Sequence, residues 1–84
     1  MSLEKLLVVD DEESIRNQLR WGLSDEYEVL TASGAAEAMR LMRSERPGLV
    51  TLHVALGVSE GPHHEGLELL DEIVDQFPLT KVIM

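Results

Sequence analysis

A regular alternation of short apolar runs with amphipathic segments restricts the folds that this chain can adopt. The apolar runs cover residues 5–9, 27–31, 49–53 and 80–84, and their length and β-branched content predict strands. Three segments of helical period lie between them, ending near residue 23, at residue 46 and at residue 77. Because alternating strands and helices favour right-handed βαβ units, we expect an α/β protein with an open, doubly wound parallel sheet covered on both faces.

Each expected helix has one apolar side. In the first helix these residues are Ile15, Leu19 and Leu23, with Trp21 near them. The second helix places Ala35, Ala38, Met39 and Met42 together, and the third places Leu67, Leu70, Ile73, Val74 and Phe77 together. We expect the two methionines and Trp21 to fill the core or a partner surface. Asp11 and Ser33 are the expected N-caps of the first two helices.

Composition limits the classes of function. The 84 residues suffice for one domain, and a hydrophobic content of 44% indicates a folded globule. Sixteen acidic residues against seven basic ones give a net charge of -9, so this segment is not expected to contact nucleic acid directly. The absence of cysteine excludes disulfides and thiolate metal sites, and no apolar run is long enough to span a membrane. We therefore expect a cytoplasmic protein.

The expected topology brings three polar residues together. In open sheets of this type the functional crevice lies beyond the carboxyl ends of the strands, where successive connections diverge. For the flavodoxin-like strand order 2-1-3-4, that place is between the first and third strands, which end at Asp10 and Asp11 and at His53. Paired carboxylates predict a divalent cation such as Mg²⁺. The alternative is structural: Asp11 caps the helix, and Asp10 belongs to a solvated acidic face.

The motifs at these positions resemble a known family. The stretch "LLVVDDEESIRNQLRWGL" is similar to the opening of a two-component response-regulator receiver domain, whose first strand ends in an acidic pair. The stretch "RPGLVTLHVALG" resembles the third strand of that family, and "GLELLDEIVDQFPLTKVIM" resembles its third helix and fourth strand. The likeness extends over essentially all of residues 1–84, which we interpret as a single receiver domain, truncated at its C-terminus with the fifth strand missing.

The resemblance implies roles for three residues. Asp10 and Asp11 match the acidic pair that holds Mg²⁺, and His53 occupies the position of the phosphoacceptor aspartate. Three interpretations of His53 remain open. It is a substitution that silences phosphorylation, a structural residue bonded to the acidic pair and sensitive to pH, or a residue that accepts phosphate on nitrogen or binds a transition metal. In each case Mg²⁺ binding is expected to be weakened or absent.

The resemblance also implies partners. A receiver domain works with a sensor histidine kinase and controls an output domain, here expected to bind DNA; it is a signalling module and not an enzyme. One alternative is a pseudo-receiver that acts only through protein contacts. Another is a different flavodoxin-like protein, such as a phosphatase, although "DDEES" lacks the glycines of a phosphate loop. The uncovered final strand predicts a homodimer or swapped dimer. His63 and His64 are expected in a solvated loop.

Overall fold

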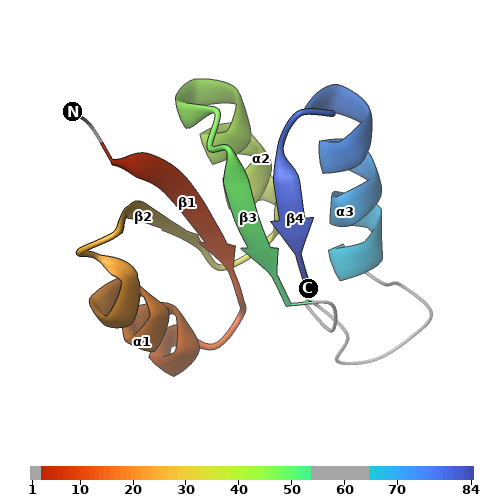
Figure 1. Cartoon of the computed structure of the whole chain (residues 1–84). Coiled ribbons are helices and arrows are strands. Elements are labelled where there is room, and N and C mark those ends of the chain that lie inside the picture. The colour runs from red at the N-terminus through yellow and green to blue at the C-terminus, as the bar shows by residue number, and fades with distance from the viewer. Residues whose placement is uncertain (1–2, 54–64) are drawn as a thin grey trace.

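The chain forms a parallel sheet with helices on both faces (Figure 1). The computed structural model describes residues 3–53 and 65–84. Within these ranges the elements are β1 (Glu4–Val9), α1 (Glu13–Leu23), β2 (Tyr27–Ala32), α2 (Ala35–Glu45), β3 (Leu49–Leu52), α3 (Glu65–Gln76) and β4 (Lys81–Ile83). All strand pairs are parallel, and the strand order is β2-β1-β3-β4. The predicted fold class and strand order are confirmed.

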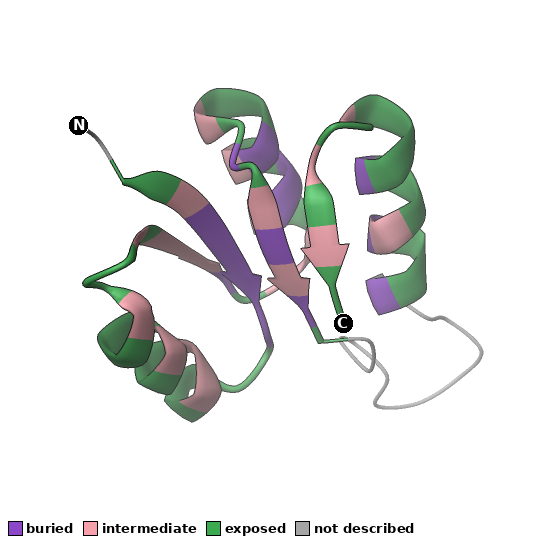
Figure 2. Ribbon diagram, in the orientation of Figure 1, coloured by how far each residue is buried: buried purple, intermediate pink, exposed green. Residues whose placement is uncertain are grey.

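The main core lies between the sheet and the layer formed by α2 and α3. Strands β1 and β3 are apolar along most of their length because they occupy the centre of the sheet, and Figure 2 shows them as its most deeply buried part. The predicted apolar side of α2 is confirmed, since Ala38, Met39 and Met42 are buried. The buried core consists of Leu7, Val9, Ala32, Ala38, Met39, Met42, Val50, Leu52, Leu69 and Ile73.

Helix α1 packs alone, among the described helices, on the opposite face of the sheet. It contacts β1 and β2 and contributes no fully buried residue, although Leu19 and its neighbours one turn away are half-buried. Trp21 is 81% exposed, so it does not fill the core with the apolar side of the helix, and its role at a partner surface stays a prediction. The reason is helical geometry: two residues correspond to about 200° of rotation, which turns Trp21 away from both Leu19 and Leu23.

The register of α3 also differs from the prediction. Leu69 is fully buried although it is not one of the predicted apolar-side residues, whereas Leu67 is 45% exposed and Val74 is 54% exposed. Ile73 is fully buried, as predicted. Leu70 and Phe77 are partly buried against the core, as predicted. Because apolar residues occur on more than one side of this helix, its period alone does not decide which side packs, and contact with α2 and the sheet selects the side that carries Leu69.

Neither predicted N-cap forms. The cap positions are Glu12 for α1 and Gly34 for α2, and neither residue makes a side-chain capping bond. Ser33 lies one residue before the cap of α2, where its N–H donates to the Glu37 carboxylate at 2.8 Å. The Glu37 carboxylate, in the first turn of α2, therefore accepts the hydrogen bond of a backbone N–H just before the helix. This contact takes the place of a cap by a serine hydroxyl.

The predicted exposure near β4 is found among the described residues. Ile83 is 46% exposed and Met84 is 67% exposed, on an edge strand whose one partner within residues 3–53 and 65–84 is β3. The predicted truncation after the fourth strand and the predicted dimer stay predictions. His63 and His64 lie outside the described residues. No helix within residues 3–53 and 65–84 is long and apolar enough to cross a membrane.

Candidate functional site at the ends of two central strands

The candidate site is built by the parallel pairing of β1 with β3. Val9 and Leu52 are partners at the ends of these strands, and the His53 N–H donates to the Val9 carbonyl at 3.0 Å. On the other side of β1, the Asp10 N–H donates to the Ala32 carbonyl at 3.1 Å. These two backbone bonds hold Asp10 and His53 beside each other at the same edge of the sheet.

The side chains of the three predicted site residues meet at this edge. One possible ligand atom from each of Asp10, Asp11 and His53 lies within 4.8 Å of the other two. Asp10 is buried, with 8% of its surface exposed, while Asp11 and His53 are exposed. The sequence predicted this juxtaposition from topology alone, because parallel strands place their carboxyl ends at one edge.

Asp10 is fixed by two contacts from the chain that follows it. Its Oδ1 accepts the Glu12 N–H at 2.9 Å, and its backbone carbonyl accepts a hydrogen bond from Arg16 Nη1 at 2.7 Å. The structural alternative in which Asp11 caps α1 is therefore wrong, since the carboxylate that bonds the entry to the helix belongs to Asp10. Asp11 makes no side-chain hydrogen bond to the described part of the chain and faces the cluster with His53.

Arg16 is a site residue that the sequence did not identify. Helical period places it on the polar side of α1, yet its guanidinium reaches back to the carbonyl at the end of β1. The only sequence signal is its position six residues after Asp10, early in the helix. This distance lets the long side chain reach the strand end, but helical period gives no reason to prefer that contact to solvent.

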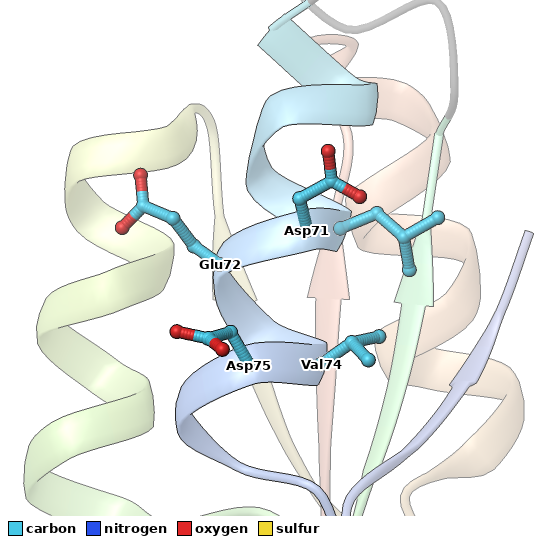
Figure 3. Close-up of a pocket in the computed structure, with 5 residues that line it drawn as sticks. Asp71, Glu72, Val74 and Asp75 are labelled. Carbon is cyan, nitrogen blue, oxygen red and sulfur yellow. The ribbon is translucent and has the colours of Figure 1, made fainter.

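A hollow of about 230 Å³ adjoins Asp10 and His53, between α1 and the ends of β3 and β4. Its lining includes Asp10 and His53 together with apolar groups from Val8, Leu19 and Ile83. A larger hollow of about 750 Å³ lies on α3, where Glu72 and Asp75 project from one side of the helix and Val74 from the other (Figure 3). The residues that line it come from one helix and include no basic or imidazole side chain, so the chemistry favours the strand-end hollow.

The donors at the strand ends fit Mg²⁺ only in part. Carboxylate oxygens from Asp10 and Asp11 are hard ligands of the kind that Mg²⁺ prefers. The third donor is an imidazole nitrogen, which suits Zn²⁺, Ni²⁺ and Cu²⁺ far better than Mg²⁺. Compared with the aspartate that the resemblance implies at this position, His53 also leaves the site with one carboxylate fewer.

Comparison with known proteins identifies the family. The model for the response regulator receiver domain matches residues 6–84. The chain belongs to the response-regulator receiver family. A solved receiver domain of NtrX from Brucella abortus is 42% identical, with a TM-score of 0.80 over 92% of this chain and 62% of that one. A CheY-like receiver domain protein from Methanospirillum hungatei JF-1 is 32% identical, with a TM-score of 0.86 over 99% of this chain and 63% of that one.

The curated relatives of this receiver domain include transcriptional regulators and response regulators. The alkaline phosphatase synthesis transcriptional regulatory protein PhoP of Bacillus subtilis is 37% identical over 82 residues, which are 96% of this chain and 32% of that protein. A putative NtrX-like response regulator of Rickettsia conorii is 34% identical over the whole chain, which spans 17% of its length. The chain is thus a receiver domain of two-component response regulators, a family of signalling modules that work with histidine kinases and carry output domains.

Proposed function

We propose that this receiver domain carries signals by protein contact and does not form the acyl phosphate of its family at position 53. The observation that supports the proposal is the position of His53, which follows β3 directly and lies beside Asp10. This is the position that the resemblance assigns to the phosphoacceptor aspartate. The fold and the acidic pair are retained, while the residue that would carry the phosphoryl group differs in chemistry.

The chemistry of the acceptor explains why the substitution matters. An acyl phosphate forms when a carboxylate oxygen bonds to phosphorus and the bond between phosphorus and the leaving group breaks. Imidazole has no such oxygen, so the mixed anhydride cannot form at His53. The metal site is altered too: Asp10, Asp11 and His53 would offer Mg²⁺ two carboxylates and an imidazole, and a bound Mg²⁺ would supply positive charge to an incoming phosphoryl group. We therefore propose that Mg²⁺ binding at Asp10 and Asp11 is weak.

The proposed partners are a sensor histidine kinase and an output domain on the same polypeptide. The transcriptional regulators among the relatives support a DNA-binding output domain. The net charge of -9 supports a division of labour, since a segment with sixteen acidic and seven basic residues has no electrostatic attraction for phosphate backbones. In this proposal the receiver is the regulatory part, and any DNA contact belongs to the output domain.

Intact mass spectrometry tests the proposal. The protein, expressed over its full reading frame, is incubated with Mg²⁺ and a small phosphodonor such as acetyl phosphate, beside the H53D variant. We expect the unaltered protein to keep its mass and the H53D variant to gain the mass of a single phosphoryl group. The phosphoryl group transfers from acetyl phosphate to the new carboxylate: the bond between phosphorus and the new carboxylate oxygen forms, the bond between phosphorus and the acetate oxygen breaks, and acetate leaves.

The H53N variant is the matched control, because it is similar in size to H53D and lacks a nucleophilic carboxylate. It should keep its mass. Modification of the unaltered protein would show that it accepts phosphate and would refute the proposal. If the H53D variant is folded but gains no mass, position 53 is not the acceptor position in this fold, and the assignment that the family resemblance implies is wrong.

A further inference from the structure

The strand-end cluster has a donor set that suits a metal ion other than Mg²⁺. We propose that Asp10, Asp11 and His53 form a binding site for a divalent first-row transition-metal ion, with Zn²⁺ strongly preferred to Mg²⁺. The inference goes beyond the proposed function, since it concerns the identity of a bound ion and requires no phosphoryl transfer. It rests on the burial, charge and chemistry of these three side chains.

Asp10 is a buried carboxylate without a cationic partner in the described part of the chain. The ion pairs found there are Lys5 with Glu45 and Arg40 with Glu37, and both lie elsewhere. Arg16 contacts the backbone carbonyl of Asp10 and not its carboxylate. Burying an unpaired charge is costly, and the carboxylate of Asp11 adds a second negative charge within 4.8 Å. A bound cation would remove both penalties.

His53 determines which cation fits. Carboxylate oxygens bind both Mg²⁺ and Zn²⁺, so Asp10 and Asp11 alone do not discriminate strongly between them. An imidazole nitrogen is a common ligand of Zn²⁺ and other late first-row ions and a poor one for Mg²⁺. Two carboxylates and one imidazole match the three protein ligands that open zinc sites use, with solvent at the remaining position.

The backbone preorganises two of the three ligands. His53 is held by its N–H bond to Val9, and Asp10 is held by the bonds to Ala32 and Glu12, so the ends of two central strands set the ligand positions. The adjoining hollow of about 230 Å³ exceeds the roughly 30 Å³ that a water molecule occupies in the liquid, so water ligands fit beside the ion.

Isothermal titration of the folded protein with ZnCl₂ and, separately, with MgCl₂ tests the proposal. We expect one Zn²⁺ per chain. Losing an outer-shell partner of a metal ligand already costs up to about 100-fold in affinity, so losing the imidazole itself should cost at least that much. The H53A variant should therefore bind Zn²⁺ at least about 100-fold more weakly than the unaltered protein. The H53D variant should lose preference for Zn²⁺ and gain affinity for Mg²⁺.

A second readout and a second variant locate the bound ion at His53. The imidazole resonances of His53, assigned by their absence in H53A, should shift on addition of Zn²⁺ and not of Mg²⁺. The H63A/H64A double variant should bind Zn²⁺ as the unaltered protein does. The proposal is overturned if Zn²⁺ binds no more tightly than Mg²⁺, if folded H53A keeps the full affinity, or if H63A/H64A loses it. None of these outcomes bears on the phosphodonor experiment, which reports on position 53 without Zn²⁺.

Discussion

The register of α3 gives the sharpest test of the packing. Leu69 is 1% exposed within the core, while Leu67 on the same helix is 45% exposed. Truncating a fully buried leucine to alanine costs about 3 kcal/mol, because apolar contact is lost and a cavity is left. The same change at a half-exposed leucine should cost less than about 1 kcal/mol. The expected difference between L69A and L67A is thus about 2 kcal/mol or more.

Urea unfolding followed by far-ultraviolet circular dichroism measures this difference. Trp21 fluorescence is a poor probe because that side chain is 81% exposed in the folded protein. With a slope of about 1 kcal/mol per molar urea for a small domain, L69A should lower the midpoint by about 2–3 M relative to L67A. If L69A does not fold, the milder I73V change, which should cost about 1 kcal/mol, replaces it. Equal midpoints for the two leucine variants, or a lower one for L67A, would refute the assigned register.

Three further outcomes follow from local contacts. Arg46 is the C-cap of α2 and has a φ of 48°, a conformation that glycine adopts without strain. R46G should therefore stabilise the protein by about 0.5–1 kcal/mol and raise its thermal midpoint by a few degrees. A lowered midpoint would contradict this. The Thr80 hydroxyl donates to the Pro47 carbonyl at 3.1 Å, so T80V should cost about 1 kcal/mol in urea unfolding, whereas T80S should keep most of that stability. A hydrogen bond to the Glu45 carboxylate raises the pKa of Lys5 above its ordinary value of 10.5. The contribution of Lys5 to stability is therefore complete below pH 10.5 and is lost as the pH rises through the higher pKa of the folded state. The difference in thermal midpoint between the unaltered protein and K5M should shrink over that pH range. A difference that stays constant would argue against this coupling.

Much of the fold was predictable because its signals are local. Buried central strands require continuous apolar runs, and the runs around Val8 and Val50 mark β1 and β3 without tertiary information. Helices between successive strands then restrict the connections to right-handed crossovers in a parallel sheet. The predicted ends of the elements differ from the structure by only one or two residues at most positions, including β3, which ends at Leu52 and not at His53.

The site was partly predictable for the same topological reason. Strand order alone placed Asp10, Asp11 and His53 at one edge, and their ligand atoms do meet. The division of roles within the acidic pair was not predictable, because both residues are good helix caps and only the path of the chain brings Oδ1 of Asp10 to the Glu12 N–H. The contact of Arg16 with the strand end depends on the same path.

Period, composition and chain connectivity are enough to predict the order of the elements, the parallel sheet and the polar residues at its carboxyl edge. Packing between the elements decided which side of α3 is buried, since Leu67 and Leu69 are equally apolar and differ only in what packs against them. It also decided that Trp21 faces solvent and that Asp10 is the buried member of the acidic pair. Burial depends on contacts between elements far apart in the chain, which a local pattern does not contain.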